Sequence, residues 1–195
     1  MIGGATAVGL VFKRGVILAA EKRMAYGSFI AAKRVRKVFK ITDKVGAACA
    51  GWMADMQEVV RELQYIIRLR SLELSVEPSV SSIAKLTSVL LRQNRLYPLM
   101  TQIIIGGYVR EPKVFSLDPL GSLLEDKYVA VGSGGEIAIG LLESEYQEEI
   151  NLEKAKNLVL RAIKSAIERD AISGDGVDFL IITDDSTFEE TVIFR

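Results

Sequence analysis

An apolar run without alternation, Val16-Ile17-Leu18-Ala19-Ala20, is the feature that most constrains the fold of this chain of 195 residues. A strand that is apolar at every position is typical of one that is buried on both faces. Its sheet therefore needs a packed layer on each side. Hydrophobic residues make up 49% of the sequence, which is enough to fill a sizeable core between such layers.

The order of the periodic segments predicts which layers these are. Strands and helices occur in separate groups: strands, two helices, strands, two helices and strands again. This grouping indicates an α+β fold, a four-layer αββα sandwich with two packed sheets and a helix pair outside each. The expected strands are 6–13, 16–23, 35–41, 45–50, 102–109, 113–117, 127–131, 177–183 and 191–194, and the expected helices are about 54–74, 80–96, 135–146 and 152–170.

Capping residues and one basic cluster add local detail. Ser81 or Ser82 is expected to cap the second helix, and Asn151 the fourth. The cluster Lys33-Arg34-Val35-Arg36-Lys37 is interpreted as the solvated face of a strand. No linker or internal repeat interrupts the pattern, so we expect one domain.

Charge and hydropathy argue against several kinds of partner. Lysine plus arginine and aspartate plus glutamate number 25 each, a balance that gives no electrostatic reason to expect nucleic acid. No apolar run approaches the ~20 residues of a membrane span. The first residues, Met1-Ile2-Gly3-Gly4, lack the features of a signal peptide. We therefore expect a cytoplasmic protein with neither a nucleic-acid nor a membrane partner.

The histidine and cysteine counts narrow the chemistry further. The sequence contains no histidine, which removes Ser-His-Asp and Cys-His mechanisms and the usual zinc sites. A hydrolase with this composition needs an amine or a carboxylate as its base. The single cysteine, Cys49, allows no internal disulfide and is typical of a packed core residue. We expect neither a metal nor a cofactor.

Six motifs carry a resemblance to a known family: "TAVGL", "AAEKR", "KVFKI", "AGWMAD", "VGSGG" and "ERDAISGDG". At this spacing the chain resembles the β subunits of the proteasome core particle of the archaeal type, which are N-terminal nucleophile hydrolases. The resemblance runs from residue 5 to about residue 184. It implies the same four-layer sandwich, with residues 1–4 as a leader or propeptide remnant and 5–195 as a single β-type domain.

The resemblance also implies a chemistry. In an active member, self-cleavage exposes a threonine as the new N-terminus; its hydroxyl attacks the peptide carbonyl and its own α-amino group is the base, so no histidine is needed. In this chain the nucleophile position is Ala5, which has no hydroxyl.

The other residues of the implied site are present. The family's site positions correspond to Glu21, Lys37, Ser133, Asp170 and Ser173, with Gly51 for the oxyanion and Met24, Val35, Cys49 and Met53 for the substrate pocket. Many relatives have aspartate where this chain has Glu21, and Arg23 matches an arginine whose role is taken as structural. A pair such as Glu21 and Lys37 could by itself be a structural ion pair, but the combination favours the functional reading.

The implied function is that of a silent subunit within a threonine-type endopeptidase complex that degrades unfolded polypeptides. The implied partners are α subunits and other β subunits, in heptameric rings stacked into a barrel, and an ATPase cap. Two alternatives keep the subunit active: Thr6 serves as nucleophile, or the alanine replaces a native threonine. A third alternative is an unrelated ligand-binding domain. The stretch Gly132-Ser133-Gly134-Gly135 lacks the further glycine or lysine of a nucleotide-binding loop.

Overall fold

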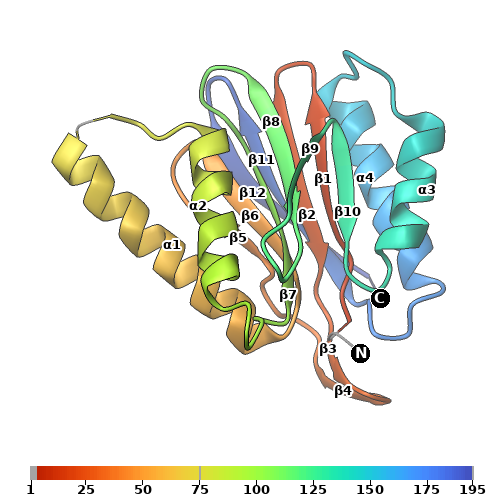
Figure 1. The fold of residues 1–195 in the computed structure, drawn as a ribbon. Helices are drawn as coiled ribbons and strands as arrows, with labels where there is room; N and C mark the ends of the chain where they lie inside the picture. Colours follow the sequence, from red (N-terminus) through yellow and green to blue (C-terminus); the bar gives the residue numbers. More distant parts are fainter. Residues whose placement is uncertain (1–3, 75, 195) are drawn as a thin grey trace.

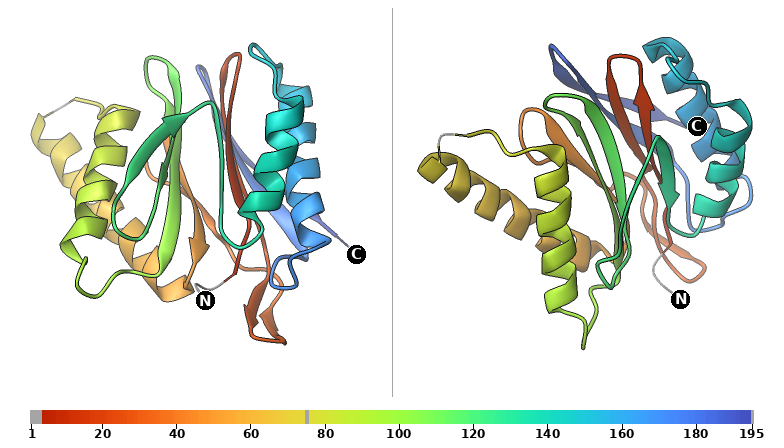
Figure 2. Two further views of the ribbon diagram at one scale, coloured as in Figure 1. Left: turned by 45° about the vertical axis from the view of Figure 1, so that its right-hand side comes forward. Right: turned by 45° about the horizontal axis from the view of Figure 1, so that its top comes forward.

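The computed structural model describes residues 4–74 and 76–194 and arranges them in four layers. Two antiparallel sheets of five strands each pack face to face, and a pair of helices covers the outer face of each sheet (Figure 1; Figure 2). The predicted αββα sandwich is therefore confirmed. Of the leader expected at residues 1–4, only Gly4 is among the described residues.

The first sheet contains the apolar run from which the prediction started. Its strands, in spatial order, are β10 (Tyr128–Val131), β1 (Ala7–Phe12), β2 (Gly15–Glu21), β11 (Gly176–Thr183) and β12 (Thr187–Ile193). Every residue of β2 is buried, because β2 lies in the middle of its sheet and is covered on both faces. Its last residue, Glu21, lies at the end of the sheet where the candidate site forms.

The second sheet supplies the other half of the sandwich. Its strands, in spatial order, are β5 (Val38–Lys40), β6 (Val45–Gly51), β7 (Thr101–Tyr108), β8 (Pro112–Leu117) and β9 (Leu123–Asp126). Alternate residues of β6 face opposite layers: Ala47 and Cys49 pack with the helices, whereas Ala48 and Ala50 pack between the sheets.

Four helices in the described residues form the outer layers. Helices α1 (Met53–Leu74) and α2 (Val80–Gln93) cover the second sheet, and α3 (Gly135–Glu145) and α4 (Leu152–Ile167) cover the first (Figure 1). Asn151 caps α4 as predicted, since its side chain accepts a hydrogen bond from the Lys154 backbone. The cap of α2 is Ser79 and not Ser81 or Ser82, because the Ser79 hydroxyl accepts the Ser82 N–H.

One strand assignment from the sequence is wrong in its first part, and three strands were not predicted. The basic cluster 33–37 is irregular and not a strand, and Lys37 is only 2% exposed. The hairpin of β3 (Met24–Tyr26) and β4 (Phe29–Ala32) was missed, as was β9. The hairpin extends from one end of the sandwich (Figure 1). Its strands do not alternate between buried and exposed residues, so no period of two is present in the sequence.

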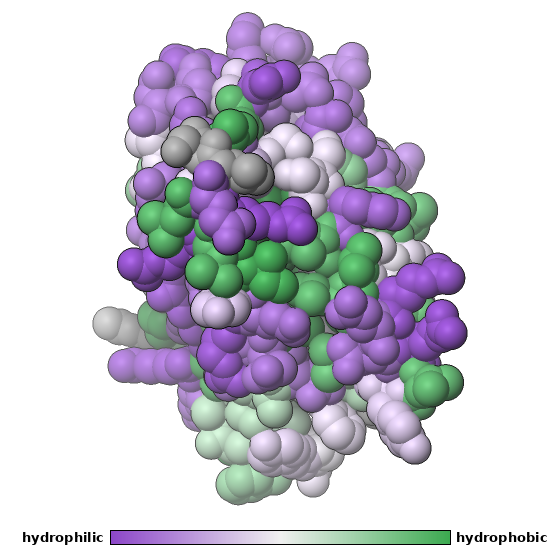
Figure 3. All heavy atoms as spheres, turned by 60° about the vertical axis from the view of Figure 1, so that its left-hand side comes forward, coloured by the Kyte–Doolittle hydropathy of each residue, from purple (hydrophilic) through white to green (hydrophobic). Residues whose placement is uncertain are grey.

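The helical face of α1 and α2 carries apolar side chains among polar ones (Figure 3). The exposed large apolar residues of these helices include Tyr65, Leu69, Leu72 and Val89. No helix in the described part of the chain is long and apolar enough to span a membrane.

The cap of α2 can be tested by two matched serine substitutions. Ser79→Ala is expected to lower the free energy of unfolding by about 1 kcal/mol, because it removes the acceptor for the Ser82 N–H. Ser81→Ala, the control, is expected to stay within about 0.5 kcal/mol of the unmodified chain. Urea denaturation measures both. An equal loss for Ser81→Ala would contradict the assignment of the cap.

Candidate active site

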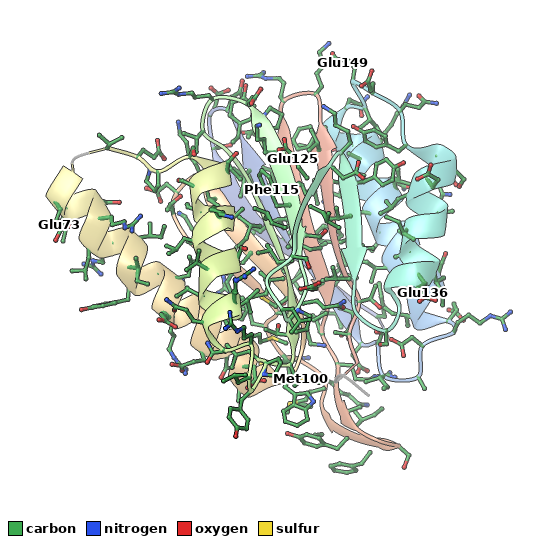
Figure 4. All side chains as sticks on the ribbon, in the orientation of Figure 1. Glu73, Met100, Phe115, Glu125, Glu136 and Glu149 are labelled. Atoms are coloured by element: carbon green, nitrogen blue, oxygen red, sulfur yellow. The ribbon has the colours of Figure 1, made fainter. Side chains whose placement is uncertain are left out.

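A cavity of about 310 Å³ opens where the β3–β4 hairpin meets the start of α1. Figure 4 places Met100 at this end of the sandwich, and the Met100 carbonyl accepts the Trp52 N–H at 2.8 Å. The residues that line the cavity are mostly apolar or aromatic: Gly4, Arg23, Met24, Ala25, Tyr26, Lys37, Gly51, Trp52, Met53 and Ala54. A cavity of this kind suits an apolar side chain next to a polypeptide backbone.

A buried ion pair lies at the inner end of the cavity. The Lys37 ammonium donates to Glu21 Oε1 and, at 2.5 Å, to the carbonyl oxygen of Arg23. Glu21 Oε2 accepts the backbone N–H groups of Arg23 at 2.6 Å and of Gly174 at 2.9 Å. Both carboxylate oxygens are therefore satisfied, although Glu21 has no exposed surface.

Burial is the main influence on the Glu21 carboxyl. It raises the pKa of Glu21 above its ordinary value, because the charged form loses its hydration. The Lys37 ammonium and the two backbone N–H groups act in the opposite direction by stabilising the carboxylate. The ammonium of Lys37 and the two backbone N–H groups therefore take the place of water in stabilising the charged Glu21 carboxylate.

A second polar cluster surrounds the backbone of Ala5. The Ala5 N–H donates to Ser133 Oγ at 3.2 Å. The hydroxyls of Ser133 and Ser173 both donate to Asp170 Oδ2, at 2.5 Å and 2.7 Å. Asp170 follows α4, and Ser133 precedes α3, so the two helices of one layer present these groups to the start of β1. The Ala5 methyl is fully buried in the core between the sheets.

The neighbouring hydroxyl, that of Thr6, belongs to a different set of contacts. Thr6 Oγ1 lies 2.8 Å from Ser173 Oγ. Because the one hydroxyl hydrogen of Ser173 goes to Asp170, Thr6 is the donor and Ser173 the acceptor. Thr6 is fully buried, and it is not among the residues that line the cavity.

Two glycines of the site have backbones that other residues would not tolerate. Gly51 lines the cavity with φ of 137°, and a Cβ there would collide with the Met100 carbonyl. Gly132 has φ of 93°, and a Cβ there would collide with the carbonyl of Ala5. The close approach of strands at these points therefore requires glycine.

The predicted substrate pocket corresponds only in part to the cavity. Met24 and Met53 line it, but Val35 and Cys49 do not. Cys49 is fully buried on the helix side of β6, and burial raises the pKa of its thiol to about 12. At neutral pH this cysteine is a thiol and not a nucleophile.

The sequence interpretation also missed some of the lining. It did not assign Tyr26 or Trp52 to the pocket, although Trp52 lies within the "AGWMAD" motif between Gly51 and Met53. In the described residues, no group of three or more acidic, cysteine or histidine side chains is placed to hold a metal ion.

A family model and individual relatives both assign the chain to the same family. The family model described as "Proteasome subunit" matches residues 1–182. The chain is 50% identical over 179 residues to "Proteasome subunit beta 1" of Ignicoccus hospitalis, covering 92% of this chain and 90% of that protein. It is 45% identical over 188 residues to "Proteasome subunit beta 1" of Nitrosopumilus maritimus, covering 96% and 95%. It is 44% identical over 187 residues to "Proteasome subunit beta 2" of Thermofilum pendens, covering 95% and 92%. The chain belongs to the proteasome β-subunit family.

Because the pair is buried, removing one of its charges is expected to destabilise the fold much more than removing both. Lys37→Met leaves Glu21 buried without its counter-ion and is expected to lower the free energy of unfolding by about 3–5 kcal/mol. The double variant Glu21→Leu/Lys37→Met is expected to recover most of that loss, because no charge stays buried. Chemical denaturation at pH 7 measures both variants. A double variant as unstable as the single one would contradict this account of the pair.

The same variants predict a dependence on pH. The folded state of Lys37→Met holds the Glu21 carboxyl with a raised pKa, so it binds a proton more tightly than the unfolded chain does. Its stability, relative to the double variant, is therefore expected to be highest below the ordinary Glu pKa of 4.5 and to fall as the pH rises above it. Denaturation curves at several pH values measure the difference, and a difference that does not change with pH would refute the prediction.

Proposed function

We propose that this chain is a catalytically silent β subunit of a proteasome core particle, a threonine-type endopeptidase complex. Its role there is structural: it forms part of the ring and supports assembly. The observation that carries the proposal is that residue 5 is an alanine: its backbone N–H donates to Ser133, which donates to Asp170, but its side chain is a methyl group where the family motif has the attacking hydroxyl.

The loss of this one oxygen removes two steps of the family's chemistry. Without a hydroxyl at residue 5, no acyl-enzyme forms with a substrate. Self-cleavage after Gly4 needs the same hydroxyl, so the nitrogen of Ala5 remains a peptide amide. An amide N–H donates a hydrogen bond, as it does here to Ser133, but it is not a base.

The contacts among the other proposed site residues support the proposal. The Lys37 ammonium, with Glu21 as its counter-ion, borders the cavity, and Gly51 leaves space for a substrate backbone. Ser133, Asp170 and Ser173 form a connected network at the nitrogen of residue 5. These contacts favour descent from an active subunit over an accidental likeness.

Thr6 is a poor substitute for the missing nucleophile. Successive residues of a strand face opposite sides, and a shift of one residue would reverse every side chain of β1. The Thr6 hydroxyl is also engaged in donating to Ser173. We therefore propose that Thr6 has a structural role in holding the Ser173 hydroxyl.

The proposed partners are α subunits and other β subunits in heptameric rings, with an ATPase cap that delivers unfolded polypeptides in the cytoplasm. The relatives carry the printed names "beta 1" and "beta 2", which favours particles that contain more than one kind of β subunit. The exposed apolar residues of α1 also favour contact with another subunit, since Tyr65 is 66% and Leu72 75% exposed.

Restoring the hydroxyl tests the proposal. In particles assembled with α subunits and a partner β subunit whose own nucleophile has been removed, Ala5→Thr is expected to give loss of residues 1–4 and cleavage of a fluorogenic peptide. The unmodified chain is expected to give neither.

Two further variants make this experiment specific. Adding Lys37→Ala to Ala5→Thr is expected to reduce cleavage by about a hundredfold or more, because the group that activates the hydroxyl is lost. Thr6→Val in the chain with Ala5 is expected to change nothing in the assay. Cleavage by the Ala5 chain that disappears with Thr6→Val would overturn the proposal.

A further inference from the structure

Two segments from distant parts of the sequence are joined beside the Glu21–Lys37 pair. One segment is the end of β2 with residues 22–23, and the other is the loop 170–175 after α4. Gly174 contributes both of its backbone groups to this contact: its N–H donates to Glu21 Oε2 at 2.9 Å, and its carbonyl accepts the Lys22 N–H at 3.2 Å. The position of Gly174 therefore decides one of the four hydrogen bonds that hold the ion pair.

The side chain of Arg23 covers this glycine. Arg23 Nε donates to Asp175 Oδ2 at 2.8 Å, and Nη1 donates to the Ala171 carbonyl at 3.1 Å. A Cβ on Gly174 would collide with the Arg23 guanidinium. The guanidinium thus lies directly on the Gly174 backbone. Its hydrogen bonds to Ala171 and Asp175, which precede and follow Gly174 in the loop, keep it there.

Asp175 has a left-handed backbone conformation, which is uncommon for residues other than glycine but which aspartate adopts more readily than most. Its φ is 69°, in the left-handed region that glycine adopts without cost. The ion pair with Arg23 is partly buried, with 21% and 17% of the two side chains exposed. A glycine at this position would relieve the backbone but would lose the carboxylate, so the residue present keeps the ion pair at the expense of strain.

We propose that Asp175 is a positioning residue: through Arg23 it presses the loop 170–175 onto the end of β2 and so fixes the Gly174 N–H on the Glu21–Lys37 pair. The same loop carries Asp170 and Ser173. Asp175 therefore holds the two polar clusters of the site in one geometry, without itself touching Ala5, Lys37 or the cavity.

The main chain of Arg23 strengthens this coupling. Its N–H donates to Glu21 and its carbonyl accepts from Lys37, so Arg23 contacts both members of the pair. The side chain of the same residue is held by Asp175 and Ala171. A displaced guanidinium frees the loop and also frees the backbone that completes the pair.

The inference rests on the proposed function only in treating Glu21 and Lys37 as site residues; the coupling itself is tested without any catalysis. Two variants of Asp175 separate the effect of the ion pair from the effect of the backbone conformation. Asp175→Asn keeps the size of the side chain and tolerates the left-handed backbone, whereas Asp175→Gly relieves the backbone completely. Both remove the ion pair with Arg23.

A matched control exists at the other end of the first sheet. Asp184 also accepts from an arginine, since Arg14 Nε and Nη2 donate to its Oδ2 at 3.0 Å and 2.6 Å. Arg14 precedes β2 and Glu21 ends it, so the control lies about 20 Å from the pair at ~3.3 Å per residue of strand. Asp184→Asn makes the same chemical change at a more exposed arginine–aspartate contact, where Asp185 also accepts from Arg14, and it does so without reaching the site.

The measurements are amide hydrogen exchange at Gly174 and the ¹⁵N-ammonium NMR signal of Lys37, in the full chain. Both Asp175 variants are expected to exchange the Gly174 amide about tenfold faster, the effect of losing about 1.4 kcal/mol of local protection, and to shift or broaden the Lys37 signal. Asp184→Asn is expected to change neither. Midpoints of thermal unfolding are recorded alongside, since Asp175→Gly is expected to unfold no earlier than Asp175→Asn.

Two results would overturn the inference. One is a Gly174 amide and a Lys37 signal that stay unchanged in both Asp175 variants, which would make Asp175 only a turn residue. The other is an acceleration spread evenly over β2 and β11, which would reflect lower global stability and not a local coupling. Neither result bears on whether Ala5→Thr restores cleavage, so the inference and the proposed function fail separately.

Discussion

The ion pair between Glu21 and Lys37 is the interaction on which the architecture of the site depends. Placing two charges in a protein interior costs several kcal/mol for each ion, and only good geometry with all remaining groups satisfied offsets that cost. Here the offset comes from three further hydrogen bonds, two from backbone N–H groups to the carboxylate and one from the ammonium to a carbonyl. These bonds connect the end of β2, the irregular segment before β5 and the loop after α4. Apolar residues of similar size would fill the same volume at less cost, so stability alone does not explain the pair.

A connected polar network lies near this pair, around the backbone of residue 5. The hydroxyls of Ser133 and Ser173 share one carboxylate oxygen of Asp170, and the N–H of residue 5 is already placed on that network. The cavity next to it is apolar and is bordered by a charged lysine. Residue 5 itself has only a methyl group, and under the proposed function this is the position of the attacking atom.

Local patterns in the sequence predicted the layers because burial on both faces and helical periodicity are properties of short segments. Run 16–20 became the buried centre of its sheet, and Asn151 became a cap. The errors arose where a distant residue decides the outcome. The sequence places Lys37 in a solvated basic cluster, but Lys37 is buried because it pairs with Glu21 at the end of β2, which is distant in the sequence. Cys49 was assigned to the pocket, yet the pairing of β6 turns it toward the helices. Residues 170–175 gave no signal for the Arg23–Asp175 contact, since neither their spacing nor their period encodes it.

The central claim is that residue 5 carries no nucleophile in a site that is otherwise built to activate one. It is tested most directly by intact-mass spectrometry of assembled particles treated with a peptide electrophile that captures an N-terminal threonine hydroxyl. The account predicts that the active partner subunit gains the mass of the adduct, whereas this chain keeps residues 1–4 and gains nothing. A chain that has lost those residues and carries the adduct at its new N-terminus would contradict the account.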